Sequence, residues 1–187
     1  MHTTALVALG SNVGDRLTHL RGAAAAIRAL PRVRGFHASR LYETPALRLD
    51  GVGELGGVDA FLNAAVMFET DATPHALLAN LLDIETRLGR LPRSQRETWG
   101  PRPIDLDLLM LGDTRVDDPT LTLPHPRIAE RWFVLAPLAD LRPEVPVTFA
   151  HNTKPVRDWL TAIEANPDEA ACVGRVYADG SWAEAEA

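Results

Sequence analysis

Apolar residues follow two different spacings along the chain, and each spacing predicts one type of secondary structure. Short runs that are apolar throughout, or that alternate with polar residues, predict strands at residues 4–9, 33–42, 61–69 and 104–111. Apolar residues three and four positions apart predict two helices, which begin after the N-capping residues Asp15 and Thr73. Pro31 ends the first helix, and Gly89 ends the second.

These elements follow one another in the order strand, helix, strand, strand, helix, strand. This order is typical of the α+β, ferredoxin-like fold, in which β-α-β-β-α-β units form the core. Further C-terminal helices are predicted at residues 129–138 and 155–163, packed around that core. We therefore expect a single domain over residues 1–165 and an acidic extension over residues 166–187, partly frayed at its end.

The composition limits the class of protein. Hydrophobic residues make up 46% of the chain and charged residues 24%, which is typical of a soluble globular protein. No apolar stretch is long enough to cross a bilayer and the first residues lack the signal-peptide pattern, so we expect no membrane partner. The single cysteine, Cys172, excludes an intramolecular disulfide and a cysteine-based zinc site, which favours a cytoplasmic location.

The net charge of -6 is distributed unevenly. Residues 158–187 contain seven acidic residues and one base, Arg175, so the remaining chain is neutral. Residues 87–102 contain five arginines and one acidic residue. A short cationic stretch beside an acidic tail favours a small anion such as a phosphate, and we expect no nucleic-acid partner.

Two carboxylates lie close together on the last predicted strand. Asp105 and Asp107 are two positions apart, so both leave the same face of the strand, about 6–7 Å from each other. A solvated acidic edge would explain this pattern, and so would a Mg²⁺ ion, which binds one or two carboxylates together with phosphate oxygens. Arg102 favours the second interpretation, because a guanidinium and Mg²⁺ around one point stabilise a phosphoryl group during transfer.

Residues 99–107, W-G-P-R-P-I-D-L-D, resemble the signature of the 6-hydroxymethyl-7,8-dihydropterin pyrophosphokinase family. Further similarity occurs in order from about residue 5 to residue 138, at L-G-S-N (9–12), Y-E-T-P (42–45), F-L-N-A-A-V (61–66), L-P-H-P (123–126) and R-W-F (131–133). The resemblance implies a ferredoxin-like core. It also implies the transfer of diphosphate from ATP to the hydroxymethyl group of a reduced pterin in folate biosynthesis, with release of AMP.

The resemblance implies a role for individual residues. Asp105 and Asp107 would bind two Mg²⁺ ions that bridge the ATP phosphates. Contacts to phosphate and nucleotide are implied for Arg102, His125 and Arg131, with Glu85 and Trp99 on the nucleotide side. The pterin edge would be hydrogen-bonded through side chain or backbone at Thr44, Pro45, Leu47 and Asn63, and its two faces would stack on Phe61 and Phe133. A catalytic loop that closes over ATP would supply Arg93 or Arg96.

The chain departs from the family pattern in three places. Thr98 stands where the family commonly has a basic residue, and Pro126 replaces an aromatic residue. Residues 89–99 form a longer segment than in compact members, which leaves the choice between Arg93 and Arg96 open.

Two other functions remain open from the residues alone. A different Mg²⁺-dependent transferase would use Asp105, Asp107 and Arg102 but would give Asn63 no role. A ferredoxin-like regulatory module that binds a ligand without turnover would not need two carboxylates on one face. No general base is evident, and we expect a monomer whose partners are its two substrates.

Overall fold

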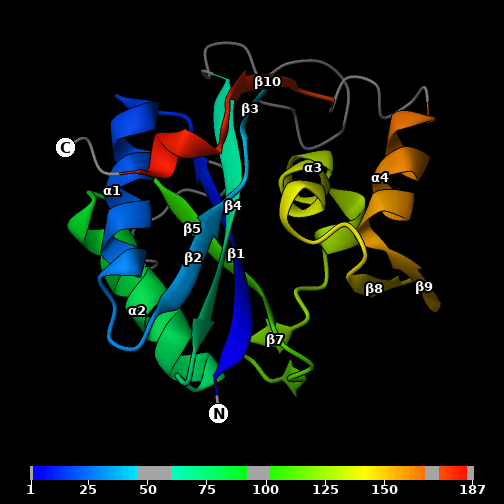
Figure 1. Cartoon of the computed structure of the whole chain (residues 1–187), viewed down its shortest axis with the longest axis horizontal. Coiled ribbons are helices and arrows are strands. Elements are labelled where there is room, and N and C mark those ends of the chain that lie inside the picture. Colours follow the sequence, from blue (N-terminus) through cyan, green and yellow to red (C-terminus); the bar gives the residue numbers. More distant parts are fainter. Residues whose placement is uncertain (1, 46–59, 92–101, 167–172, 185–187) are drawn as a thin grey trace.

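The computed structural model describes residues 2–45, 60–91, 102–166 and 173–184, which form one large antiparallel sheet and four α-helices (Figure 1). The sheet contains β1 (Thr3–Ser11), β2 (Arg34–Ala38), β3 (Leu41–Thr44), β4 (Phe61–Thr70), β5 (Asp105–Leu111) and β10 (Arg175–Ala178). The helices are α1 (Arg16–Arg28), α2 (Pro74–Arg87), α3 (Trp132–Leu141) and α4 (Val156–Glu164). Smaller elements are β6 (Val116–Asp117), β7 (Thr122–Leu123), β8 (Pro146–Phe149), β9 (Asn152–Pro155) and the 3-10 turns η2 (Ile128–Glu130) and η4 (Gly180–Ala183).

The large sheet separates two layers of helices. Its strands lie in the order β10, β3, β4, β1, β5, and β2 pairs with β4 next to β3. All of these pairs are antiparallel. Helices α1 and α2 cover one face of the sheet, while α3 and α4 lie on the other (Figure 1).

Each face of the sheet has its own core, because successive residues of a strand point to opposite faces. On the side of α1 and α2, the buried residues include Val7, Leu9, Leu62, Ala64, Val66, Phe68, Leu20, Ile27, Leu81 and Ile84. On the side of α3 they include Leu6, Ala65, Leu109, Leu135, Leu138 and Val156. Burial of one such large side chain contributes roughly 1.5–3 kcal/mol, so the sheet is held on both faces.

The predicted starts of the first two helices and the end of the second are confirmed, while α1 ends at Arg28, before Pro31. The Asp15 side chain accepts a hydrogen bond from the backbone of Thr18 at 3.0 Å, and α1 starts at the next residue. Thr73 caps α2 in the same way, and Pro74 occupies the first helical position, where its missing N–H costs nothing. Gly89 follows α2 with a φ of 92°, a backbone conformation that favours glycine.

Two predicted elements are interrupted. The strand predicted over residues 33–42 is wrong as a single element, because it divides into β2 and β3 at Ser39. The Ser39 hydroxyl accepts the hydrogen bond of the Ala65 backbone N–H at 2.9 Å, a bond that a continuous ladder would give to a carbonyl. The helix predicted over residues 129–138 also divides, into η2 and α3, because Arg131 has the extended angles φ -124° and ψ 108°.

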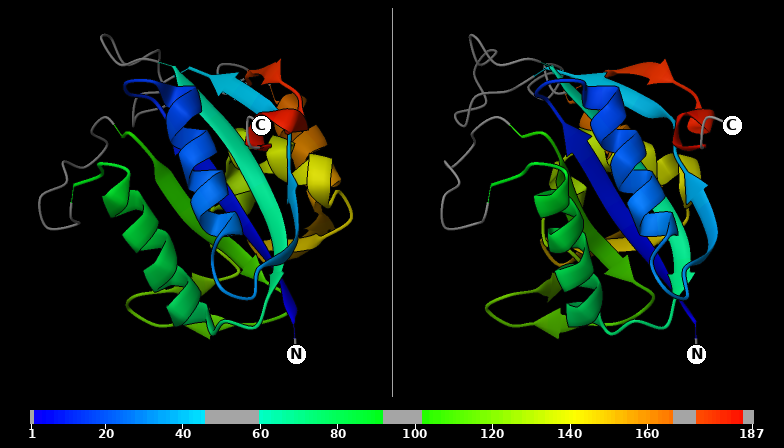
Figure 2. Two further views of the ribbon diagram at one scale, coloured as in Figure 1. Left: turned by 60° about the vertical axis from the view of Figure 1, so that its left-hand side comes forward. Right: turned by 90° about the vertical axis from the view of Figure 1, so that its left-hand side faces the viewer.

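The C-terminal residues 173–184 join the main sheet. β10 lies beside β3, and η4 packs near α1 (Figure 2). Trp182 is 3% exposed and Ala183 6% exposed, and both belong to the core under α1. A domain boundary at residue 165 stays a prediction. Beyond this residue, β10 and η4 pack against β3 and the core under α1.

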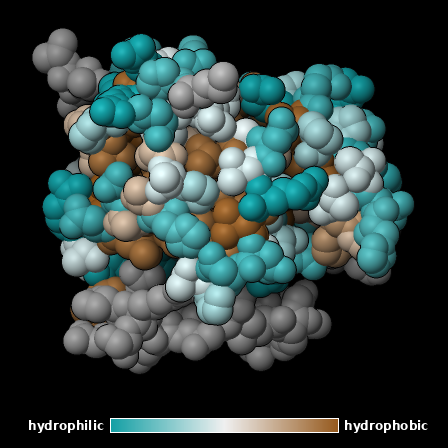
Figure 3. All heavy atoms as spheres, turned by 90° about the horizontal axis from the view of Figure 1, so that it is seen from below, coloured by the Kyte–Doolittle hydropathy of each residue, from teal (hydrophilic) through white to brown (hydrophobic). Residues whose placement is uncertain are grey.

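Helices that could span a membrane are absent from the part of the chain that the structure describes. On the lower face of the molecule, apolar atoms reach the surface only in patches between polar side chains (Figure 3).

Candidate functional site

Predicted site residues from two strands lie on the face of the sheet that α3 covers. In the pairing of the central strands, Gly10 lies opposite Asn63 on one side and opposite Asp105 on the other. Ala8 lies opposite Asp107, and residues directly opposite each other in antiparallel strands point to the same face. Neighbouring strands are about 4.8 Å apart, so the backbones at Asn63 and Asp105 are separated by roughly 10 Å. The predicted pterin and metal residues therefore border one site.

The two carboxylates of this site are neutralised to different degrees. Asp105 accepts hydrogen bonds from both Arg90 and Arg102. Burial raises the pKa of Asp105, but the charges of Arg102 and Arg90 outweigh burial and hold this pKa below its ordinary value. Asp107 has a weaker ion pair, in which Nη1 of Arg131 lies 3.8 Å from its Oδ2. Burial, followed by the charge of Asp105, raises the pKa of Asp107 to about 6.

The weakly paired Asp107 carboxylate beside Asp105 fits a bound cation. The side chains of Asp105 and Asp107 are 21% and 37% exposed, so both remain accessible. Groups of three or more His, Cys, Asp or Glu side chains that could hold a metal are absent from the described residues. The donor set therefore fits Mg²⁺, which takes one or two carboxylates and completes its shell with phosphate oxygens and water.

Glu85 on α2 bonds both an arginine of this site and the backbone of β5. Its side chain is 1% exposed and accepts hydrogen bonds from Arg90 and, at 2.8 Å, from the backbone N–H of Leu106. Arg90 in turn contacts Asp105, so Glu85, Arg90 and Asp105 form a connected network. The sequence predicted Glu85 as a nucleotide contact, which stays a prediction, while the structure connects it through Arg90 to Asp105, a predicted metal ligand. Arg90 was not among the predicted site residues, although it belongs to the arginine-rich stretch.

Asn12 is a second residue whose role the sequence analysis missed. Its Oδ1 accepts a hydrogen bond from the backbone N–H of Arg102 at 2.7 Å. The backbone N–H of Asn12 donates to the carbonyl of Arg102 at 3.1 Å. Asn12 is 1% exposed, so this pair of bonds holds Arg102 at the entrance of β5. Its position directly after the first strand, in L-G-S-N, was the available signal.

The predicted pterin residues Thr44 and Asn63 contact each other. Nδ2 of Asn63 donates to Oγ1 of Thr44 at 2.8 Å, and the two residues are 5% and 4% exposed. Gly10 leaves space for the amide, because a Cβ at this position would lie 3.1 Å from Oδ1 of Asn63. The bond to Thr44 fixes the amide plane, and the amide keeps donor and acceptor capacity for a heterocycle edge.

The start of α3 brings further predicted residues to the same side. Arg131 precedes the helix, is 18% exposed and lies with its Cζ 5.6 Å from the centre of the Phe133 ring. Phe133 and Phe61 are both half-buried, and Pro45 directly follows β3. The Arg131 guanidinium thus reaches Asp107 from the start of α3, and Phe61 lies on the strand that carries Asn63.

His125 lies between the sheet and α3 in a defined orientation. Its backbone N–H donates to the carbonyl of Leu109 at 2.8 Å, and its Nδ1 accepts from the backbone of Arg127 at 3.2 Å. Burial lowers the pKa of His125 to about 4, with further contributions from the charges of Arg131 and Arg127. The imidazole is therefore neutral near pH 7, and its Nε2 carries the proton that a ligand could accept.

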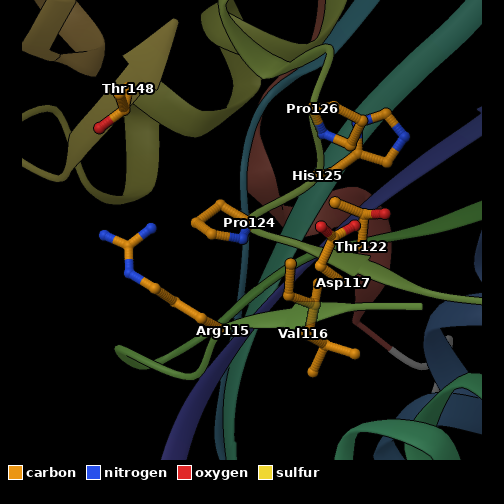
Figure 4. Close-up of a pocket in the computed structure, with 9 residues that line it drawn as sticks. Arg115, Val116, Asp117, Thr122, Pro124, His125, Pro126 and Thr148 are labelled. Atoms are coloured by element: carbon orange, nitrogen blue, oxygen red, sulfur yellow. The ribbon is translucent and has the colours of Figure 1, made fainter. Parts of the chain in front are cut away.

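A cavity of about 470 Å³ lies next to His125. It is lined by Arg115, Val116, Asp117, Thr122, Leu123, Pro124, His125, Pro126 and Thr148. Figure 4 shows Arg115 and Thr148 across Pro124 from the His125 ring. The β6–β7 hairpin thus forms a hollow beside His125, a predicted nucleotide contact, that the sequence did not predict.

The pH dependence of His125 gives a first prediction. Since the folded state lowers its pKa, the unfolded chain binds an additional proton between about pH 4 and pH 6.5, and stability should fall as the pH decreases through this window. NMR titration of the imidazole should give a value near 4, which should rise when ATP adds negative charge. The variant His125→Gln should lose this part of the pH dependence in urea unfolding. An imidazole that titrates at its ordinary value in the free protein would contradict the assignment.

Four predicted site residues, Leu47, Arg93, Arg96 and Trp99, lie outside the described residues. The structure therefore gives no account of them.

Comparison with known proteins identifies relatives over most of the chain. Residues 6–143 match the family described as 7,8-dihydro-6-hydroxymethylpterin-pyrophosphokinase (HPPK). Two relatives are named 2-amino-4-hydroxy-6-hydroxymethyldihydropteridine pyrophosphokinase. The protein from Methylorubrum extorquens is 44% identical over 143 residues, which are 76% of this chain and 85% of the relative. The protein from Bacillus subtilis is 39% identical over 145 residues, which are 78% of this chain and 81% of the relative.

Solved structures have a similar fold. A crystal structure of a triple mutant of Plasmodium falciparum HPPK-DHPS with STZ-DHP gives a TM-score of 0.66 at 15% sequence identity. The similarity covers 92% of this chain and 45% of that chain, so the chain spans about half the length of the solved protein. At this identity the likeness concerns the fold alone.

Proposed function

Since the chain belongs to the 7,8-dihydro-6-hydroxymethylpterin-pyrophosphokinase family, we propose that it transfers diphosphate from ATP to the hydroxymethyl group of 6-hydroxymethyl-7,8-dihydropterin. The products are the pterin diphosphate and AMP, and the reaction belongs to folate biosynthesis. One observation supports this function at the site. Gly10 of β1 lies between Asn63 of β4 and Asp105 of β5, on the same face of the sheet. A pterin at Asn63 would then lie beside a phosphate chain at the aspartates.

The phosphate side of the proposed site is electrostatic. Asp105 and Asp107 would hold Mg²⁺, and we propose two ions, which neutralise charge on the phosphate oxygens when bound. Arg102 and Arg131 flank the carboxylates and would bring positive charge to the same oxygens. Groups fixed in this way before the reaction stabilise developing charge without having to reorganise.

The pterin side combines edge and face recognition. Asn63, together with Thr44 and Pro45, would hydrogen-bond the edge of the heterocycle through side chain or backbone, and Phe61 and Phe133 would stack on its faces. A buried amide left without a partner costs about 1–3 kcal/mol, so the same residues would disfavour a ring without matching donors and acceptors.

The nucleotide side is the part that rests most on family likeness. The neutral His125 would donate a hydrogen bond from Nε2 to a phosphate or ribose oxygen, with Glu85 and Trp99 also on this side. Arg93 or Arg96 would contribute during transfer, and Leu47 would extend the pterin pocket.

The proposal also covers the type of fold, the oligomeric state and the cellular location. Apart from the added edge strand β10, the order β2 and β3, then β4, β1 and β5, supports a ferredoxin-like core. We also propose a monomer in the cytoplasm, which rests on the composition and the single cysteine.

The proposed reaction can be tested by its nucleotide product. Protein, Mg²⁺ and ATP are mixed with a panel of small acceptors, and AMP and ADP are separated by chromatography. AMP that appears only with the hydroxymethyl pterin is the expected result. ADP as the product, or AMP formed equally with other acceptors, would favour a different Mg²⁺-dependent transferase. Pterin binding without turnover would favour a regulatory module.

A second prediction concerns substrate selectivity at Asn63. The variant Asn63→Ala should weaken pterin binding by about 1–3 kcal/mol, because one heterocycle edge loses its partner, while ATP affinity changes little. Calorimetry with each substrate separately measures both effects. Phe133→Ala should act in the same direction through lost stacking, and Asn152→Ala, in the exposed β8–β9 hairpin, serves as the control. Equal losses for both substrates would mean that Asn63 supports the core rather than the pterin.

A further inference from the structure

The C-terminal residues 173–184 lie outside the match to the family, which ends at residue 143, yet they pack directly against the strand that carries Thr44. In the pairing of β10 with β3, Arg175 lies opposite Glu43 and Val176 opposite Tyr42. Figures 1 and 2 show β10 at the edge of the sheet, next to β3. This segment is therefore the outer neighbour of the predicted pterin strand.

The segment is anchored at its far end by a buried tryptophan. Trp182 is 3% exposed, and its Nε1 donates to the carbonyl of Ser39 at 2.8 Å. Nε of Arg21 donates to the carbonyl of Trp182 at 3.1 Å, which ties the segment to α1. Ser39 is the residue at which β2 ends and β3 follows, so the anchor lies at the start of the pterin strand.

Gly174 makes the closest approach to the site. A Cβ at this position would lie 2.4 Å from the carbonyl oxygen of Glu43, 2.6 Å from Cγ2 of Thr44 and 2.9 Å from Cζ3 of Trp132. All three distances are shorter than any ordinary carbon contact, so only glycine fits without displacement. The backbone at Gly174 thus packs against the methyl group of Thr44.

Contact with this methyl group determines where the Thr44 hydroxyl points. Cγ2 and Oγ1 are attached to the same carbon, and threonine has few allowed rotamers about χ1. With Cγ2 turned toward Gly174, Oγ1 accepts the hydrogen bond from Nδ2 of Asn63. The position of Gly174 therefore affects the χ1 rotamer of Thr44. This rotamer in turn orients the Asn63 amide, which the proposed function assigns to the pterin edge.

Ion pairs support the same strand on its opposite face. The Glu43 carboxylate accepts hydrogen bonds from Arg175 of β10 and, at 3.0 Å, from Arg16 of α1. Nη1 of Arg16 also donates to the carbonyl of Ala60 at 2.6 Å, directly before Phe61. Arg175 is 78% exposed, so its pair with Glu43 contributes little stability. Arg16 joins the end of β3 to the start of β4 through its bonds to Glu43 and Ala60.

We propose that residues 173–184 form a positioning element for the pterin side of the site, and that Gly174 is its contact with Thr44. This inference rests on the proposed function. The element acts on recognition of the heterocycle through the Thr44–Asn63 pair. Its contacts with β3 and Trp132 lie on the side of Thr44 and not at the aspartates, so we expect its effect to be larger for the pterin than for ATP.

The test is a double-mutant cycle between Gly174 and Thr44, measured by steady-state AMP formation. Gly174→Ala should raise KM for the pterin about tenfold, which corresponds to the loss of one hydrogen bond, and leave KM for ATP within twofold. Thr44→Val keeps the methyl contact but removes the hydroxyl. In a Thr44→Val background, Gly174→Ala should have little further effect on the pterin, because the bond that it disturbs is already absent.

Two further variants keep the test decisive. Val176→Ala removes a 50% exposed side chain from the same strand and should behave as wild type. If Gly174→Ala does not fold, Trp182→Phe, which removes only the N–H to Ser39, should raise KM for the pterin without changing KM for ATP.

The proposal is overturned if Gly174→Ala affects both substrates equally, leaves both unchanged, or acts undiminished in the Thr44→Val background. It is also overturned if Gly174→Ala fails to fold and Trp182→Phe behaves as wild type. A wild-type protein that forms no AMP with the pterin would instead reject the proposed function.

Discussion

Replacing Asp107 with alanine is expected to lower the rate of AMP formation by about a thousandfold or more, while the protein keeps its fold. The lost contribution is the binding and alignment of Mg²⁺ at the transferring phosphate, which is worth several kcal/mol. Stability should stay constant or increase, because burial and the charge of Asp105 already disfavour the ionised form of Asp107. Single-turnover rates and urea unfolding measure the two effects separately.

The neighbouring aspartate provides an informative contrast. Asp105→Ala should reduce turnover to a similar extent but should also destabilise the protein, since Arg90 and Arg102 would lose their shared partner. Asp113→Ala removes an exposed carboxylate in the turn after β5 and is the matched control for both variants. Near-normal AMP formation by Asp107→Ala would exclude the metal assignment.

Replacing Glu85 with alanine is expected to destabilise the protein by about 3–5 kcal/mol. Glu85 is 1% exposed, and its removal leaves the buried guanidinium of Arg90 and the N–H of Leu106 without this acceptor. Removing one partner of a buried ion pair is costly, because the remaining charge is buried away from water and has lost part of its compensation. Urea unfolding at neutral pH measures the change in free energy.

A matched control lies on the same helix. Asp83 forms an ion pair with Arg87 in which both side chains are at least 60% exposed, so Asp83→Ala should change stability by less than about 0.5 kcal/mol. Glu85→Gln should give an intermediate loss, since an amide oxygen can still accept from Leu106. If Glu85→Ala weakened ATP binding without loss of stability, Glu85 would be a nucleotide contact rather than a support for Arg90.

Local patterns were sufficient to place most elements of the fold. Caps such as Asp15 and Thr73 act within one turn of their helices, so their effect can be seen in a few neighbouring residues. The break at Ser39 could not be predicted in the same way. It depends on a bond to Ala65, which is 26 positions away and becomes a neighbour only in the folded sheet.

For the site, the alternation around Asp105 and Asp107 was enough to predict that both carboxylates leave one face, because the period of a strand is two residues. Family resemblance named Asn63, Thr44 and the arginines as candidates. Neither source indicated how the charges are distributed. Arg90 supports Asp105 while Asp107 keeps only a distant partner, and this difference depends on contacts between residues that are 15 and 24 positions apart.

The sequence by itself determined the order of the elements from β1 to β5, apart from the break at Ser39, together with the caps that begin α1 and α2 and the shared face of the two aspartates. These features depend on residues within a few positions of each other, where periodicity and capping act. Only the tertiary structure decided that Asn12 holds Arg102, that Glu85 bonds the backbone of Leu106 between the two aspartates, and that Gly174 packs against Thr44. Each of these contacts joins residues between 21 and 130 positions apart, and no local pattern encodes a contact that forms only when distant strands come together.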